Sequence, residues 1–152
     1  MELEKVAIKK LETGDLEDVL SIENSSSQSP WSRKMFLEEL GNPSAHCFTI
    51  RNKENLQDQV TGFICFRNVR DESELYNIGV HPNFRRLGIG KKLMEFYFDF
   101  CEKRRIKGFF LEVNALNASA IHLYQLFDYQ PVGMRKRFYQ GRFDALLMVR
   151  RI

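Results

Sequence analysis

The sequence contains no long apolar run, no repeat and no low-complexity tract. No stretch of about 18 apolar residues occurs, so a membrane-spanning helix is not expected. The first twelve residues, MELEKVAIKKLE, alternate charged and apolar side chains and lack the apolar segment of a signal peptide. We therefore expect a cytoplasmic protein that has no membrane partner.

Cysteine is scarce, and its spacing is not that of a metal site. The three cysteines, Cys47, Cys65 and Cys101, are odd in number and lie in apolar segments, and no CxxC or Cys/His ligand spacing is present. We expect reduced thiols in the core and no metal. Excess charge is also small, because the net charge is only +3. This charge permits an anionic ligand but does not argue for nucleic acid.

The chain has 152 residues, which suffice for one domain with a substantial core but not for two. Hydrophobic periodicity and turn residues predict the order of its elements. This order is a strand around Val6 and Ile8, a helix capped by Thr13, a helix capped by Ser32, strands over 46–51, 60–69 and 74–80, a helix over 88–105, a strand over 109–113, a helix capped by Asn117, and strands over 129–138 and 142–150.

The two N-terminal helices are predicted from apolar stripes at helical spacing. In the first helix Leu16, Val19, Leu20 and Glu23 follow helical spacing, and in the second the apolar stripe is Phe36, Leu37 and Leu40. The element order predicts an α/β (α+β) fold, with a mostly antiparallel run of strands that enters one strand–helix–strand unit near residues 74–114. We expect a three-layer α/β/α sandwich with a mixed sheet.

The segment RRLGIGKK, residues 85–92, places four cations around Gly88 and Gly90 between a predicted strand and a predicted helix. A helix N-terminus exposes unpaired N–H groups with partial positive charge, and glycines let a ligand approach the backbone. These features together predict a phosphate site, whereas the alternative is a solvated basic turn.

Two familiar nucleotide-binding motifs do not fit this segment. A P-loop needs glycine where Arg85 stands and Ser or Thr where Lys92 stands. A Rossmann GxGxxG motif needs glycine where Leu93 stands. The remaining pattern is R-x-x-G-x-G at the start of a helix.

Glu112 lies in FFLEV, residues 109–113, where every other residue is apolar. A desolvated carboxyl has a raised pKa, which suits a general base near neutral pH. The alternative is an edge-strand carboxylate that reaches water, and the strand pattern does not choose between the two. Downstream, Asn117 caps a helix and can offer its amide to a ligand. Tyr124 is either a core aromatic or a proton donor, since a phenol with a pKa of about 10 is protonated at pH 7.

From Leu75 onward the chain resembles the GNAT superfamily of N-acetyltransferases, in its ribosomal-protein-alanine N-acetyltransferase (RimI-type) branch. The matching segments are LYNIGVHPNFRRLGIGKKLM, LEVNALNASAIHLYQLF, GMRKRFY and DALLM, and upstream PWSRKMFLEEL. The resemblance leaves only residues 52–59 unmatched. It implies the GNAT fold in a single domain over residues 1–152, acetyl-CoA as cosubstrate, and a protein N-terminal α-amine as acceptor, with a ribosomal protein as the partner.

The resemblance also implies roles for particular residues. Glu112 matches the general base of the family and Tyr124 its general acid. Residues that match acetyl-CoA contacts lie on the strand before the loop, in the loop itself and at the next helix start: Ile78, Gly79, Val80, Arg85, Arg86, Leu87, Gly88, Ile89, Gly90, Lys91 and Asn117. Trp31 and Tyr139 are candidates to line a peptide entry, although Trp31 is equally well explained as a hydrophobic staple at a helix start.

Three positions depart from the branch. Gly79 replaces its usual alanine, Asn114 replaces a common arginine, and residues 127–129 read FDY in place of Leu-Gly-Phe. None of these changes affects the expected base, acid or anion loop, but together they leave the identity of the substrate open.

Rival functions are distinguishable by experiment. A lysine or small-amine acceptor needs a stronger base and would change the pH–rate profile. A sensor that binds acyl-CoA would show no thiol release. A nucleic-acid binder, suggested by the basic runs at 103–105, 135–137 and 150–151, would bind RNA or DNA at low salt, but such runs are more often solvated faces. We expect an enzyme that is a monomer or weak dimer.

Overall fold

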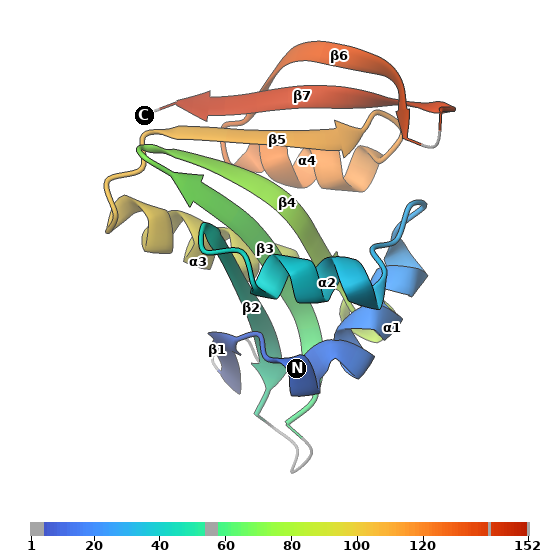
Figure 1. Ribbon diagram of the computed structural model, residues 1–152, viewed down its shortest axis with the longest axis vertical. Helices are drawn as coiled ribbons and strands as arrows, with labels where there is room; N and C mark the ends of the chain where they lie inside the picture. Colours follow the sequence, from blue (N-terminus) through green and yellow to red (C-terminus); the bar gives the residue numbers. More distant parts are fainter. Residues whose placement is uncertain (1–4, 54–57, 140, 152) are drawn as a thin grey trace.

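The computed structural model describes residues 5–53, 58–139 and 141–151, with only the backbone of Tyr139. The elements follow the predicted order with small shifts at their ends (Figure 1). They are β1 (Val6–Lys10), the 3-10 helix η2 (Thr13–Asp15), α1 (Leu16–Ser26), α2 (Arg33–Leu40), β2 (Ala45–Asn52), β3 (Val60–Val69), β4 (Glu72–Val80), the 3-10 helix η3 (Pro82–Phe84), α3 (Ile89–Glu102), β5 (Gly108–Asn114), α4 (Ala118–Leu126), β6 (Gln130–Tyr139) and β7 (Phe143–Arg151).

The seven strands form one sheet in the order β1-β2-β3-β4-β5-β7-β6. Neighbouring strands are antiparallel except β4 and β5, which are parallel and are joined through α3. The predicted mixed, mostly antiparallel sheet with one strand–helix–strand unit is therefore confirmed. A parallel pair needs a crossover connection, and α3 supplies it.

Helices cover both faces of the sheet, which gives the three predicted layers (Figure 1). One apolar cluster joins α1 and α2 to β2 and β3, and includes Leu16, Phe36 and Phe63. The other lies beneath α3 and α4 on the opposite face and includes Tyr97 and Phe109, whose ring centroids are 5.7 Å apart. All three cysteines are buried and free, as expected.

Two predicted helix caps are confirmed and one is wrong. The Ser32 hydroxyl accepts from the Met35 N–H at 3.2 Å, and the Asn117 side chain accepts from the Ala120 N–H at 3.2 Å. Thr13 does not cap α1, because residues 13–15 form a 3-10 turn first. Asp15 Oδ2 instead accepts from the Glu12 N–H at 2.9 Å.

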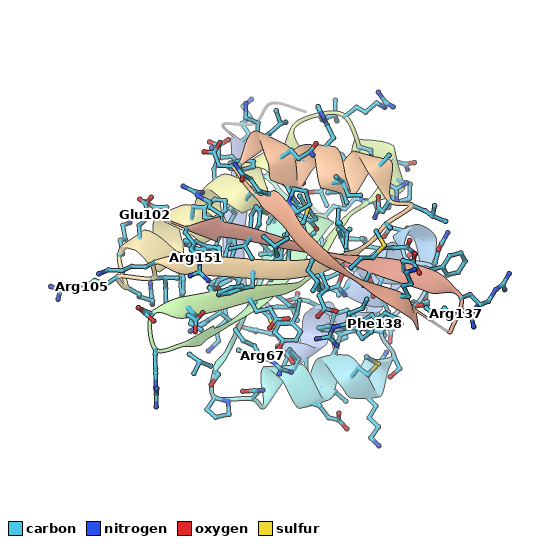
Figure 2. All side chains as sticks on the ribbon, turned by 90° about the horizontal axis from the view of Figure 1, so that it is seen from above. Arg67, Glu102, Arg105, Arg137, Phe138 and Arg151 are labelled. Carbon is cyan, nitrogen blue, oxygen red and sulfur yellow. The ribbon has the colours of Figure 1, made fainter. Side chains whose placement is uncertain are left out.

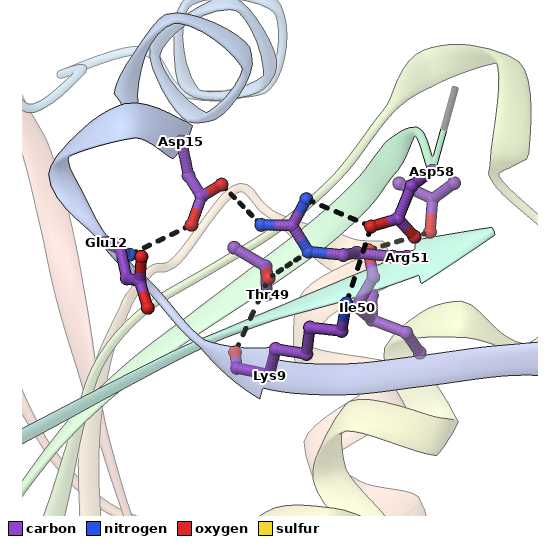
Figure 3. Close-up of polar contacts among 8 residues, drawn as sticks. Lys9, Glu12, Asp15, Thr49, Ile50, Arg51 and Asp58 are labelled. Atoms are coloured by element: carbon purple, nitrogen blue, oxygen red, sulfur yellow. Dashed lines mark hydrogen bonds and ion pairs between the residues drawn. The ribbon is translucent and has the colours of Figure 1, made fainter. Parts of the chain in front are cut away.

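Asp15 is held by a partner that lies far along the sequence (Figure 3). It pairs with Arg51 of β2, and Arg51 also donates to the Thr49 hydroxyl at 3.1 Å and pairs with Asp58 at 3.8 Å. Lys9 of β1 reaches Asp58 at 3.5 Å. This network fixes the start of α1 against β1 and β2.

The stripe predicted for α2 is partly wrong. Phe36 is buried, but Leu37 is 45% exposed and Glu39 is buried in its place. Glu39 accepts two hydrogen bonds from Arg67 of β3, at 2.6 and 2.9 Å. A bidentate guanidinium partner allows a carboxylate to be buried where an apolar residue is expected.

Figure 2 shows the side chains that lie at the two opposite ends of the sheet. Arg137 and Phe138 of β6 lie at the end near the β6–β7 turn, whereas Glu102 and Arg105 lie at the opposite end, where α3 finishes. The helix ends at Glu102, three residues earlier than predicted.

Candidate functional site

β4 and β5 run side by side only at their beginning. Glu72 to Leu75 pair with Gly108 to Leu111, and the two strands then diverge (Figure 1). At the same point β4 contains a bulge against β3, because Asn77 pairs with Cys65 and Leu75 with Phe66, so Tyr76 is an extra residue. A bulge bends its strand and re-aims side chains. The sheet therefore opens where β4 leaves β5.

A cavity of about 400 Å³ lies at this opening. Its walls come from the end of α1 and the segment after it, from β4 and β5, and from the start of α4. The lining residues are Glu23, Ser26, Ser27, Gln28, Ser29, Trp31, Leu75, Tyr76, Asn77, Ile78, Leu111, Glu112, Val113, Asn114, Leu116, Asn117 and Tyr124.

Five residues predicted from the sequence meet in this wall: Trp31, Ile78, Glu112, Asn117 and Tyr124. The other predicted cofactor contacts lie further along β4, in the segment between η3 and α3, and in the first turn of α3. They are Gly79, Val80 and residues 85–91. Tyr139 ends β6, and its side chain lies outside the described part of the structure.

The Glu112 carboxyl is neither fully desolvated nor freely exposed to water, the two environments that its sequence context allowed. Its side chain is 20% exposed, and Oε1 forms an ion pair with Arg135 Nη2 at 3.0 Å. Arg135 comes from β6 and is more than half exposed. Glu112 thus lines the cavity and is paired with a cation that does not line it. Its charge also reaches Glu74, whose pKa is raised first by burial and then by Glu112.

Tyr124 is 6% exposed and still lines the cavity, so it is both a core aromatic and a cavity residue. Its ring centroid lies 5.8 Å from that of Tyr129. Asn117 likewise has two roles in the structure, since it caps α4 and lines the same cavity. α4 therefore positions both residues, Asn117 at its N-cap and Tyr124 about two turns into the helix.

Trp31 has the position of a hydrophobic staple and also lines the cavity, and its role at a peptide entry stays a prediction. It precedes the cap of α2, and its ring centroid lies 5.1 Å from that of Phe36, the arrangement of a hydrophobic staple. The same side chain is half-buried and lines the cavity.

Glu23 is a cavity residue to which the sequence analysis gave no role. It is only 2% exposed, and Oε2 accepts from the Trp31 N–H at 2.8 Å and from Asn77 Nδ2 at 3.0 Å. Burial raises the pKa of this carboxyl, and the two hydrogen bonds lower it in part. The signal was present in the sequence, because Glu23 lies on the apolar stripe of α1.

The basic loop before α3 contains two residues in the left-handed conformation. Gly88 is the N-cap with φ +84°, and Arg86 has φ +61°. The Arg85 Nε–H donates to the Val80 carbonyl at 3.3 Å, which ties the loop to β4. Arg85, Arg86 and Lys91 are exposed. The loop can offer cations and first-turn N–H groups to an anionic group.

Gly79 is buried against Phe63, and this close contact explains sterically why glycine stands at the position. A Cβ atom at this position would lie 2.6 Å from Phe63 Cε1 and 3.1 Å from Ile22 Cγ2. The departure at residue 128 also fits its backbone, since Asp128 has φ +67° just after α4.

Neither a metal-ligand cluster nor a membrane-spanning helix occurs within residues 5–53, 58–139 and 141–151. No group of three His, Cys, Asp or Glu side chains there could hold a metal ion. None of the helices in those ranges is both long and apolar enough to cross a membrane.

The chain is similar in sequence and in fold to known proteins. A model of the acetyltransferase (GNAT) family matches residues 16–129. The [ribosomal protein bS18]-alanine N-acetyltransferase of Escherichia coli is 35% identical over 93% of this chain and 94% of that protein. The enzyme of the same name from Haemophilus influenzae is 29% identical over 93% of this chain and 95% of that protein. The crystal structure of the Escherichia coli enzyme superposes with a TM-score of 0.85, at 33% identity, over 97% of this chain and 94% of that one.

Proposed function

This chain belongs to the acetyltransferase (GNAT) family, and we propose that it transfers the acetyl group of acetyl-CoA to the N-terminal α-amine of a protein. We further propose that the acceptor is an N-terminal alanine of a ribosomal protein, that residues 1–152 form one catalytic domain, and that it acts in the cytoplasm without a metal. The observation that carries the proposal is the cavity at the β4–β5 opening, which brings Glu112 and Tyr124 together beside Ile78.

The basic loop suits the pyrophosphate of acetyl-CoA. Residues 86–91 combine exposed cations with a helix N-terminus, and Gly88 adopts the left-handed conformation that lets the backbone turn at that point. β4 leads from this loop to the cavity, since Ile78 lines the cavity and Val80 accepts from Arg85. In the proposed complex the pantetheine arm lies along residues 78–80, and Asn117 makes a further contact.

In the proposed reaction Glu112 takes a proton from the acceptor amine. The amine attacks the thioester carbonyl directly, so the C–N bond forms and the C–S bond breaks without a covalent enzyme intermediate. Backbone N–H groups of residues 78–80 stabilise the charge that develops on the carbonyl oxygen. Tyr124 donates its phenolic proton to the departing thiolate. An α-amine has a pKa of about 7.7–8.0, so only modest base strength is needed.

Variants of the two proposed catalytic residues test this mechanism. We expect Glu112→Gln and Tyr124→Phe each to lower kcat by about 10²–10⁴-fold, the range for lost acid–base catalysis, and to leave acetyl-CoA affinity nearly unchanged. Turnover is measured by thiol release and affinity by calorimetry. Tyr129→Phe is the matched control, because it makes the same change beside Tyr124 in a buried residue that does not line the cavity. Near-wild-type turnover in both Glu112→Gln and Tyr124→Phe would contradict the mechanism.

A further inference from the structure

The candidate cavity is anionic. The ionisable side chains that line it, within the described part of the chain, are the carboxyls of Glu23 and Glu112 and the phenols of Tyr76 and Tyr124. No described lysine, arginine or histidine is among the lining residues. Arg135 reaches Glu112 without itself lining the cavity, which leaves Glu23 as the carboxylate that has no cation beside it.

The two buried glutamates of the described residues differ in the groups that offset the cost of burying their charge. Glu39 is 4% exposed and accepts two hydrogen bonds from the Arg67 guanidinium. Glu23 is 2% exposed, its two donors are neutral, and it forms no ion pair with any Lys, Arg or His in the described ranges. A buried carboxylate without a cationic partner is costly. A cationic ligand in the cavity would supply the missing partner.

We infer that Glu23 binds the ammonium form of the acceptor amine, and so holds the acceptor N-terminus in the cavity before Glu112 removes its proton. This inference rests on the proposed function and names the residue that recognises the charge of the acceptor. It assigns separate roles to the two carboxyls. Glu23 is the binding residue and acts on acceptor affinity, whereas Glu112 acts in the chemical step.

The carboxylate is held in place before any ligand arrives. Oε2 is fixed between the Trp31 N–H of the segment after α1 and the Asn77 amide of the β4 bulge. The same segment is held from the other side of the cavity, because Asn114 Nδ2 of β5 donates to Gln28 Oε1 at 2.9 Å. A preorganised group loses little conformational entropy on binding, so its charge can contribute to affinity in full.

The test separates the charge of Glu23 from its hydrogen bonds. Glu23→Gln keeps an oxygen that can accept from Trp31 and Asn77 but removes the charge, whereas Glu23→Ala removes both. Asn24→Ala is the control, since it changes the neighbouring, exposed residue of α1. Calorimetry on the CoA-bound enzyme compares an alanine-starting peptide that has a free α-amine with the same peptide acetylated at that amine.

We expect the wild type and Asn24→Ala to bind the free-amine peptide at least about tenfold more tightly than the acetylated one, as for one charge-assisted hydrogen bond. Glu23→Gln should lose this preference. Trp31 is the one tryptophan of the chain, so its fluorescence reports on the segment after α1. Its emission should be unchanged in Glu23→Gln and shifted to the red in Glu23→Ala, where the hydrogen bond to its backbone is lost.

A Glu23→Gln enzyme that keeps the wild-type preference would overturn the inference and leave Glu23 as a structural residue. Equal binding of the two peptides by the wild type would overturn it as well. Acetyl transfer by the wild type is measured in parallel, so a failure of the proposed function appears as absent transfer. A failure of this inference appears instead as an unchanged preference in Glu23→Gln.

Discussion

Replacing Gly79 with alanine, the residue usual in the branch that this sequence resembles, should destabilise this protein. The new Cβ would lie 2.6 Å from Phe63 Cε1 and 3.1 Å from Ile22 Cγ2, and both neighbours are almost fully buried. Neither side chain can move into solvent, so the core must shift. Gly79 is not among the residues with positive φ, so the cost comes from packing and not from the backbone conformation.

The magnitude follows from two opposing terms. Overpacking a core costs about 1–3 kcal/mol, and exchanging glycine for alanine returns about 0.4–1 kcal/mol by restricting the unfolded chain. With both terms near the middle of their ranges, the net loss is about 1–2 kcal/mol. For a protein of this length, each kcal/mol shifts Tm by about 2–4 °C, so we expect a drop of about 2–8 °C in thermal unfolding followed by circular dichroism.

Two further variants make this prediction specific to Phe63. Gly14→Ala is the control, because a Cβ there meets nothing within 4 Å, and its Tm should stay the same or rise. In a Phe63→Leu background the added methyl has room, so the two changes together should cost less than their sum. A Gly79→Ala protein as stable as the wild type, or strictly additive effects with Phe63→Leu, would refute the packing argument.

Two other predictions concern the loop and the buried carboxyl. Arg86→Ala should weaken acetyl-CoA binding by about tenfold in calorimetry through loss of a charge-assisted contact. Arg105→Ala is the control and should not weaken it, because Arg105 is also exposed and has a left-handed backbone but lies beyond the far end of α3 (Figure 2). If Arg86→Ala bound acetyl-CoA as tightly as Arg105→Ala does, the loop would be only a turn. Because the pKa of Glu23 is raised in the folded state, its contribution to stability is present below the unfolded value of about 4.3 and is lost as pH rises through the folded pKa. The Tm advantage of Glu23→Gln over the wild type should therefore grow from pH 4 to pH 7, and a constant difference would contradict this linkage.

The sequence predicted those features that depend on nearby residues. The Ser32 and Asn117 caps bond to N–H groups three residues away. The alternation of apolar strands and helical stripes was sufficient to predict the three layers and the parallel pairing of β4 with β5.

The features that the sequence missed depend on partners that are distant along the chain. Glu39 is buried because Arg67 of β3 reaches it, and Leu37 is exposed instead. Asp15, and not Thr13, is the N-cap residue of α1, and Asp15 is held by Arg51 of β2. The importance of Glu23 depends on Asn77, 54 residues later, and on a bulge that periodicity cannot reveal.

The central claim, transfer of an acetyl group to a protein N-terminal α-amine, is tested most directly by the position of the acetyl group in its products. Peptides that start with alanine and contain an internal lysine are incubated with the protein and acetyl-CoA, and the modified nitrogen is located by mass spectrometry. We predict acetylation at the N-terminal nitrogen and none when that nitrogen is blocked. Acetylation of the lysine in the blocked peptide, or no transfer to either nitrogen, would contradict the account.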